Sequence, residues 1–298
     1  MENVFKMTLM GRSNMEVEKF TSPVITVRPH ASIHDTLVKM QLNFVKRIVI
    51  VNDNMPVGIV TERDINRFLE NDKTARALSE IPVNHVMKKN PITIVDGFED
   101  HFEQCTTRMD TFKIGSIIIV NSEGKLGGIV TKTDITKAFS VIYGGKCRVR
   151  DYMSEKVITC RETDTLRFAL NMMNTNNISR LVVTDNNGKP IGIITTNTFL
   201  THSDYFTNGV TRTRDYLLST KKDAELHVVD LIRKELVTVN PEDDLATAAY
   251  CMVKNEISGI PVVNDEKIVG VITKFDVVRA FSDVGINENL KVKYKNTY

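Results

Sequence analysis

Residues 58–64, GIVTERD, decide the fold, because their pattern returns three more times in the chain. The other copies are GIVTKTD at 128–134, GIITTNT at 192–198 and GVITKFD at 270–276. The threonines of successive copies are separated by 70, 64 and 78 residues. A repeat at this spacing indicates one structural unit that occurs four times, with each unit burying its apolar face against a neighbour.

The sequence around each heptapeptide predicts the same order of elements. A short extended segment comes first and is followed by apolar residues at helical spacing, such as Ile33, Leu37 and Met40. A β-branched run such as 48–51, polar turn residues and the glycine-containing strand come next. A closing helix carries apolar residues such as Ile65. We therefore predict an α/β (α+β) fold in which each copy is strand, helix, strand, strand, helix.

These elements place the four copies, named copies 1 to 4, at 16–70, 83–139, 149–200 and 228–281. Units this short bury too little surface to be stable alone, so we expect two pairs with pseudo-twofold symmetry, in residues 1–143 and 144–298. Segment 201–227 is interpreted as an insertion or linker with one short helix, and the alternative is a lid or partner surface. The polar tail after Val284 is expected to be mobile at its end.

Composition predicts a folded chain without an unusual charge. Apolar residues make up 42% and charged residues 26%, as in average globular domains. The 39 basic and 37 acidic side chains nearly cancel, which argues against nucleic-acid or membrane partners. We see no run of 18 apolar residues and no signal peptide in residues 1–15. The four scattered cysteines are expected to be buried thiols, and we expect a cytoplasmic protein.

The Thr-x-x-Asp part of the heptapeptide has two interpretations. The threonine can cap the helix and the aspartate can complete a capping box, with no ligand involved. Alternatively, free amides and the hydroxyl bind phosphate while the carboxylate accepts hydrogen bonds from two ribose hydroxyls. The pairs with this pattern are Thr61 with Asp64, Thr131 with Asp134, and Thr273 with Asp276. Copy 3 has Thr195 with Thr198 and lacks the charge, so we expect that site to be empty, altered or filled differently.

The chain resembles tandem CBS-domain proteins over about residues 16–281. The stretches that carry the resemblance are the heptapeptides at 58–64, 128–134 and 270–276, with SRLVVTDNNGKPIG at 179–192 and SGIPVVNDEKIVG at 258–270. The layout of four CBS repeats in two Bateman modules is similar to that of the nucleotide-sensing regulatory subunit of AMP-activated protein kinase. The resemblance implies that the threonine lies beside the phosphates and that the aspartate binds ribose.

The resemblance also implies further ligand contacts. Basic residues just before the middle strand contact phosphates in a central cleft, and Lys46-Arg47 and Ser179-Arg180 match that place. Copies 2 and 4 have the uncharged pairs Gly115-Ser116 and Ser258-Gly259 at that place. This alternation suggests that copies 1 and 3 supply charge to nucleotides that copies 2 and 4 hold. The small residues are expected to leave room for a ring of the nucleotide. The alternative for Arg47 and Arg180 is a surface salt bridge, and Arg63 is a further candidate that could instead face solvent. Four pairs resemble the family's base-contacting strand: Thr26-Val27, Thr93-Ile94, Thr159-Cys160 and Thr238-Val239. The alternative is that they are ordinary strand residues with one side facing inward.

No catalytic or metal-binding pattern stands out. The six histidines share no repeated partner, and we find neither a phosphate-binding GxxxxGK[ST] loop nor GxGxxG after a strand. We therefore predict a non-enzymatic, ligand-sensing regulatory protein that binds AMP, ADP or ATP between paired copies and modulates a separate protein effector, as a monomer or homodimer. The alternatives are an interaction scaffold with vestigial pockets, such as a transcription-linked or assembly factor, and a module that responds to S-adenosylmethionine or a metal.

Overall fold

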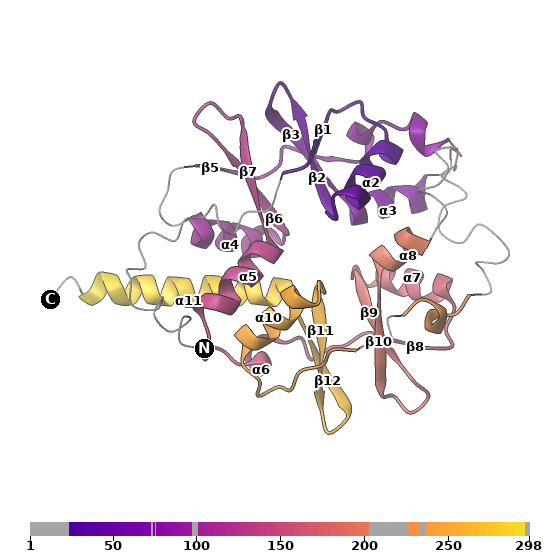
Figure 1. The fold of residues 1–298 in the computed structure, drawn as a ribbon, viewed down its shortest axis with the longest axis vertical. Coiled ribbons are helices and arrows are strands. Elements are labelled where there is room, and N and C mark those ends of the chain that lie inside the picture. Colours follow the sequence, from indigo (N-terminus) through magenta and orange to yellow (C-terminus); the bar gives the residue numbers. More distant parts are fainter. Residues whose placement is uncertain are drawn as a thin grey trace.

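The computed structural model describes residues 24–72, 74, 76–96, 101–202, 226–232 and 236–295. Figure 1 shows four α/β units around a common centre, with copies 1 and 2 on one side and copies 3 and 4 on the other. We call copies 1 and 2 the N-terminal half and copies 3 and 4 the C-terminal half. The predicted α/β class is confirmed. Most of the expected insertion, residues 203–225, lies outside the described residues.

The element bounds follow the predicted order. The N-terminal half contains β1 (Thr26–Val27), α2 (Ile33–Leu42), β2 (Arg47–Asn52), β3 (Met55–Thr61), α3 (Glu62–Asn71), β5 (Thr93–Val95), α4 (His101–Phe112), β6 (Ser116–Val120), β7 (Leu126–Thr131) and α5 (Lys132–Ile142). The C-terminal half contains β8 (Thr159–Arg161), α7 (Leu166–Thr175), β9 (Arg180–Thr184), β10 (Pro190–Thr195), α8 (Thr196–His202), α10 (Leu245–Lys254), β11 (Gly259–Asn264), β12 (Lys267–Thr273) and α11 (Lys274–Lys295). The connecting elements are η3 (Leu78–Glu80), η4 (Val83–His85), β4 (Lys88–Lys89), α6 (Val149–Tyr152) and η7 (Val228–Asp230).

Two details differ from the sequence prediction. The opening strand of copy 4 is a single parallel bridge between Val239 and Val262. The closing helix of copy 4 does not end near residue 281 but continues to Lys295, and the end of the polar tail, residues 296–298, lies outside the described residues. Helix α11 packs along α4, where the rings of Phe281 and Phe102 lie 6.2 Å apart. At the start of the tail, a β-carbon at Gly285 would lie 3.3 Å from Cγ of Glu103 in α4, so packing against α4 continues past Val284.

All four sheets share one register. The threonine that ends the last strand lies opposite the first residue of the middle strand, and the pairs are Thr61 with Arg47, Thr131 with Ser116, Thr195 with Arg180, and Thr273 with Gly259. A register shift follows beside the repeated glycine in each hairpin, which marks a β-bulge there. The register therefore places an arginine against the capping threonine in copies 1 and 3, and a small residue in copies 2 and 4.

The repeated glycine gives room to a connecting segment in two of the copies. A β-carbon at Gly58 would lie 2.4 Å from the Met87 sulfur, and one at Gly270 would lie 2.8 Å from the Met153 sulfur. At Gly128 the nearest atom would be the β-carbon of Ile119, at an ordinary 3.7 Å. In copies 1 and 4 the glycine thus allows close packing of the connections before copies 2 and 3.

Replacing Gly270 with alanine is expected to lower the free energy of unfolding by about 1–3 kcal/mol, the usual cost of overpacking. Besides the Met153 sulfur, the new methyl group would lie 3.1 Å from the carbonyl oxygen of Ser154, which belongs to a paired backbone and cannot move freely. Gly128→Ala is the matched control and should change stability by less than about 0.5 kcal/mol. Urea unfolding of both variants provides the measurement, and equal midpoints would contradict the packing role of Gly270.

The largest apolar clusters join the two halves rather than the copies within a half. One cluster contains side chains of copies 1 and 3, such as Ile50 and Val183. Another contains side chains of copies 2 and 4, such as Ile117 and Val262. A smaller cluster lies between the sheets of copies 1 and 2 and contains Val49, Ile118, Val120 and Ile129. The starts of α3 and α8, and of α5 and α11, meet across the boundary between the halves, where Glu62 contacts Asn197 and Lys274 contacts Thr133.

Candidate functional site

The threonine and aspartate of the heptapeptide form a closed capping box. In copy 1 the Thr61 amide donates to Asp64 Oδ2 at 3.0 Å, and the Thr61 hydroxyl donates to the same oxygen at 2.6 Å. The Thr131 and Asp134 pair repeats these contacts at 2.7 and 2.6 Å. The pair in copy 4 repeats them at 2.8 and 2.7 Å. The structural interpretation of the motif therefore holds in all three copies that have the aspartate.

The expectation of free amides at these helix starts is wrong for the first helical position of every copy. It is also wrong for the third position in copies 1 to 3 and for the second position in copy 4, where the Phe275 amide donates to the Thr273 hydroxyl at 3.2 Å. The backbone amide of the residue after each threonine donates to the carbonyl oxygen of the residue directly before the middle strand. Examples are Lys132 N to Gly115 O at 3.1 Å and Lys274 N to Ser258 O at 3.2 Å. The Asp64 amide donates to the Thr61 hydroxyl at 3.2 Å. These contacts satisfy donors that a phosphate would otherwise take, so a phosphate bound here would depend more on side-chain cations than on the helix start.

Copy 3 builds the same turn without a charge. The Thr195 amide donates to Thr198 Oγ1 at 3.2 Å, and the two threonine hydroxyls lie 3.2 Å apart. These hydrogen bonds are longer than those to the carboxylates, as expected for a neutral acceptor. Capping therefore does not require the aspartate of the other copies.

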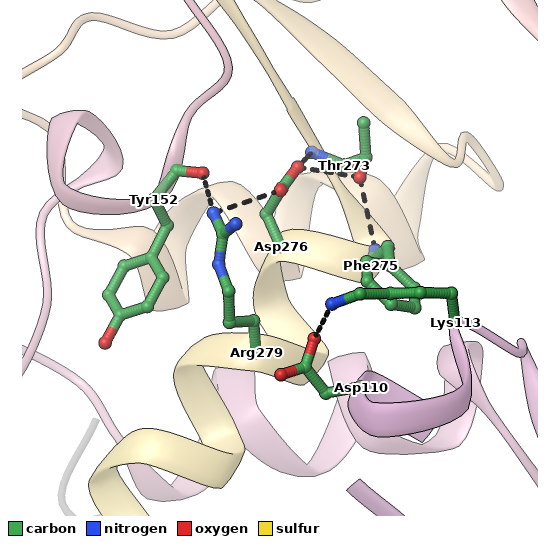
Figure 2. A network of polar contacts seen from close by, with 7 residues as sticks. All are labelled: Asp110, Lys113, Tyr152, Thr273, Phe275, Asp276 and Arg279. Atoms are coloured by element: carbon green, nitrogen blue, oxygen red, sulfur yellow. Dashed lines mark hydrogen bonds and ion pairs between the residues drawn. The ribbon is translucent and has the colours of Figure 1, made fainter. Parts of the chain in front are cut away.

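The second oxygen of two aspartates faces a cation. Asp64 Oδ1 lies 3.3 Å from Lys88 Nζ, and Asp276 Oδ1 lies 3.3 Å from Arg279 Nη2. Figure 2 shows the Arg279 guanidinium between Asp276 and the carbonyl oxygen of Tyr152, to which it donates at 2.6 Å. Burial raises the pKa of Asp276, and its bonds from Thr273 and the charge of Arg279 oppose that rise. Asp276 is thus held in a fixed orientation by its own helix and, through Arg279, by the start of copy 3.

The arginines that begin the middle strands β2 and β9 point toward the partner copy in their own half. Arg47 Nη1 would lie 3.1 Å from a β-carbon at Gly115, and Arg180 Nη1 would lie 2.7 Å from one at Gly259. Arg180 Nη2 also donates to Ser258 Oγ at 2.7 Å. The space beside these glycines therefore accommodates a guanidinium group, which corrects the expectation that it is left open for a ring. The glycines are needed for the arginines to approach copies 2 and 4.

Burial lowers the pKa of both arginines. The pKa of Arg47 is lowered by burial, and the charge of Asp134 is the strongest opposing influence. Burial lowers the pKa of Arg180 to about 10, and Asp276 opposes it in the same way. Each arginine of copies 1 and 3 is therefore electrostatically paired with the heptapeptide aspartate of copies 2 and 4.

Sequence reasoning missed Lys132 and Lys274, the residues directly after the threonines of copies 2 and 4. Lys274 is 7% exposed, and its Nζ donates to Thr133 Oγ1 in the other half at 3.1 Å. Lys132 Nζ lies 5.8 Å from the centre of the Phe275 ring, also in the other half. The available signal was the alternation at this position, which holds lysine in copies 2 and 4 and Glu62 and Thr196 in copies 1 and 3.

These lysines lie in a cluster of positive charge. Burial, followed by the charge of Arg47, lowers the pKa of Lys132 to about 7. Burial, followed by the charge of Lys46, lowers the pKa of Lys274 to about 8. Keeping these two lysines positively charged therefore costs free energy, and a bound anion would reduce that cost.

The free energy of unfolding is expected to rise with pH between about 7 and 10 because of Lys132. In this range the folded protein has released the Lys132 proton, whereas the unfolded chain keeps it up to an ordinary pKa of 10.5, so the unfolded state binds more protons. Lys132→Gln should therefore be more stable than the wild type at pH 7, by an amount that shrinks toward pH 10. Urea unfolding across this range is the measurement, with the exposed Lys125→Gln as the control. A difference that does not vary with pH would contradict the shifted pKa.

Polar contacts also join copies 1 and 3. Glu62 Oε1 accepts from Asn197 Nδ2 at 2.8 Å. Arg63, a candidate phosphate ligand, donates to the carbonyl oxygen of Asn177 and, at 2.7 Å, to its side-chain oxygen. Arg67 donates to the same side-chain oxygen at 2.8 Å. Arg63 therefore contacts the other half rather than facing solvent.

The pairs expected to contact the base lie in the opening strands β1, β5 and β8 and, in copy 4, at the bridge formed by Val239. Ile94 and Val239 are buried in the core that copies 2 and 4 share, whereas Thr93 and Thr238 are exposed. Thr26 and Val27 are half-buried, and the Thr26 carbonyl accepts from Lys39 Nζ at 2.8 Å. Core packing accounts for the apolar members of copies 2 and 4 without a ligand.

Comparison with known proteins identifies the family. The CBS domain model matches residues 16–71, 83–141, 149–204 and 228–283, and the chain belongs to the CBS domain family. MJ1225 of Methanocaldococcus jannaschii is 26% identical over 275 residues, which cover 87% of this chain and 95% of MJ1225. Its crystal structure, described as that of a proposed archaeal homologue of g-AMPK, has a TM-score of 0.72 and covers 89% of this chain and 99% of that one. The predicted resemblance to tandem CBS proteins is thus confirmed.

Two further relatives match most of this chain. MJ1404 of the same organism is 27% identical over 272 residues, which cover 90% of this chain but only 62% of MJ1404. A crystal structure of a protein from Pyrococcus horikoshii has a TM-score of 0.62 at 18% identity, covers 89% of this chain and 99% of that one, and shows the same fold. Within the described ranges, no helix is long and apolar enough to cross a membrane. The same part of the chain contains no group of three His, Cys, Asp or Glu side chains placed to hold a metal ion.

Proposed function

We propose that the protein is a non-catalytic regulatory protein that binds adenine nucleotides where its four CBS domains meet. The observation that carries the proposal is that Arg47 and Arg180 reach the neighbouring copy beside Gly115 and Gly259, where the charges of Asp134 and Asp276 act on them. An anion-binding side chain and a carboxylate acceptor from different domains thus face one another in two equivalent places.

The role that we propose for each side chain follows from its hydrogen-bonding chemistry. Asp134 and Asp276 would accept hydrogen bonds from the two ribose hydroxyls through Oδ1, since the capping hydrogen bonds are made to Oδ2. Arg47 and Arg180 would hold phosphate oxygens by charge-assisted hydrogen bonds. The capping threonines orient the carboxylates. At Asp276 the ribose must share or replace the contact with Arg279, which lies 3.3 Å away.

The arrangement supports regulation through the relative position of the halves. A ligand that contacts both halves stabilises the arrangement in which both sets of groups face it, and a partner that prefers this arrangement responds to the ligand. The hydrogen bond from Lys274 Nζ to Thr133 Oγ1 supports such coupling, because it joins the C-terminal half to the N-terminal half beside Asp276 and Asp134.

Thermal unfolding in the presence of nucleotides tests the proposal. A ligand at about 100 times its dissociation constant adds about 2.7 kcal/mol to the free energy of unfolding. We expect ATP, ADP or AMP at millimolar concentration to raise the Tm, and Arg180→Gln to reduce the rise. Arg150→Gln, which removes a surface ion pair with Glu242, is the matched control and should leave the rise unchanged.

A second candidate is an interaction scaffold whose pockets bind no ligand. The closed capping boxes favour it, because both threonine groups and one carboxylate oxygen are satisfied within the chain. The absence of a Tm rise with every adenine compound, S-adenosylmethionine included, would decide for the scaffold. A Tm rise with S-adenosylmethionine alone would instead indicate an adenosyl-responsive module, whose ligand carries no phosphate.

A further inference from the structure

The start of copy 3 is held along copy 4 by backbone hydrogen bonds at both of its ends. At one end, the Val149 amide donates to the carbonyl oxygen of Asp243 at 2.9 Å. At the other end, the amides of Ser154 and Val271 each donate to the other residue's carbonyl oxygen at 3.0 Å. We call residues 147–154 the strap, because the chain enters the C-terminal half through this segment and is fastened there to copy 4.

One side chain of copy 4 holds the middle of the strap. Arg279 Nη2 donates to the carbonyl oxygen of Tyr152 at 2.6 Å, and the guanidinium carbon of Arg279 lies 5.7 Å from the centre of the Tyr152 ring. The same nitrogen lies 3.3 Å from Asp276 Oδ1, between that carboxylate and the strap (Figure 2). A single donor atom therefore serves both the strap and the carboxylate that we propose to bind ribose.

In copy 1 these two contacts are made by different residues. Arg67 follows its capping threonine at the same distance as Arg279 does, and it donates to the side chain of Asn177 at 2.8 Å. The cation that lies 3.3 Å from Asp64 is Lys88, which belongs to the connecting strand β4. The shared use of one nitrogen in copy 4 is therefore a property of its own residues and does not follow from the repeated motif.

We propose that Arg279 is a positioning residue that couples occupation of the Asp276 site to release of the strap. The proposal rests on the proposed function and deepens it. A ribose hydroxyl that donates to Asp276 Oδ1 takes the place of Arg279 Nη2, so the guanidinium loses the charge that orients it toward the Tyr152 carbonyl. Ligand binding then weakens the hold of copy 4 on the strap. Loosening of the strap in turn favours the ligand, because coupling between two sites is reciprocal.

The relative strengths of the two interactions favour displacement of the arginine. The Arg279 side chain is 41% exposed, and an ion pair that is so accessible to solvent contributes little stability. The Asp276 side chain is only 9% exposed, and hydrogen bonds from two ribose hydroxyls to such a carboxylate are strengthened by its charge. Arg279 is thus an internal competitor that a nucleoside can replace, and the displaced guanidinium can return to water.

Hydrogen–deuterium exchange and isothermal titration with ATP test the proposal in the whole chain, as wild type and as Arg279→Met. The amides to follow are those that the strap protects, such as Arg150 and Met153. In the wild type, saturating ATP should speed their exchange by about 2- to 5-fold. Arg279→Met should show the faster exchange without ATP and should bind ATP about 2- to 5-fold more tightly, as expected when a partly exposed competing ion pair is lost.

The direction of the affinity change separates this role from a structural one, since loss of a merely structural contact would weaken ATP binding. Arg67→Met is the matched control, because it removes the equivalent cation of copy 1, and it should leave strap exchange and ATP affinity as in the wild type. Unchanged strap exchange on ATP binding, or weaker ATP binding by Arg279→Met, would overturn the inference while leaving nucleotide binding intact. Failure of the wild type to bind ATP, ADP or AMP would overturn the proposed function itself, and the coupling with it.

Discussion

Phe139→Ala is expected to lower the free energy of unfolding by about 3–5 kcal/mol, the range measured when a buried phenylalanine is truncated. Phe139 is fully buried, and its ring lies 5.2 Å from that of Tyr143 and 6.4 Å from that of Phe281. Tyr143 and Phe281 also meet edge to face at 5.1 Å. Because Phe281 belongs to copy 4 and the other two rings to helix α5 and the residue that follows it, in the N-terminal half, the truncation removes packing between the halves.

Loss of the Phe139 ring should also change the cooperativity of unfolding, which truncation of an ordinary core residue would not do. Urea unfolding should show a reduced midpoint in Phe139→Ala, and the transition should broaden if the halves then unfold separately. Phe112→Ala in the same copy is the matched control, because that side chain is 57% exposed and its truncation should cost less than about 0.5 kcal/mol. Similar midpoints for the two variants would mean that the aromatic cluster does not hold the halves together.

The repeat, the order of elements and the capping geometry could all be predicted from the sequence because they are local. The hydrogen bonds between Thr61 and Asp64 lie within one helical turn, so the motif itself specifies them. The same holds for the bulge beside each repeated glycine, which lies in a single hairpin. Copy 3 shows the limit of the motif, since Thr198 supports the turn without the carboxylate.

The contacts between halves could not be predicted in this way, because they join residues far apart in the sequence. Length and repeat number suggested that cores form within pairs, whereas the two large clusters join copies 1 with 3 and 2 with 4. Lys274 was overlooked for the same reason, since its contact with Thr133 spans 141 residues. The small size of Gly115 was noticed but assigned to a ligand ring, and only the fold shows that Arg47 needs the space.

Asp276→Ala is expected to weaken nucleotide binding by about 10-fold or more, whereas Thr198→Ala should weaken it far less. Charge-assisted hydrogen bonds to a carboxylate contribute about 1.5–3 kcal/mol, against about 0.5–1.5 kcal/mol for a neutral hydroxyl, and each 1.4 kcal/mol changes affinity tenfold. Both variants also lose a contact with the capping threonine of their helix, Thr273 or Thr195. The stability loss should therefore be of order 1 kcal/mol in each and cannot by itself explain a difference in binding.

Asp276→Asn separates the two roles further, because asparagine keeps an acceptor for the Thr273 amide but removes the charge that faces Arg279 and the proposed ribose. We expect this variant to remain close to the wild type in stability and to approach Asp276→Ala in affinity when ATP binding is measured by isothermal titration. Asp110→Asn, which removes only the nearby surface ion pair with Lys113, is the control shown in the same view in Figure 2. Unchanged ATP affinity in a folded Asp276→Asn protein would mean that the carboxylate serves the helix cap alone, and the nucleotide would then have to be held entirely by the cations at the junction.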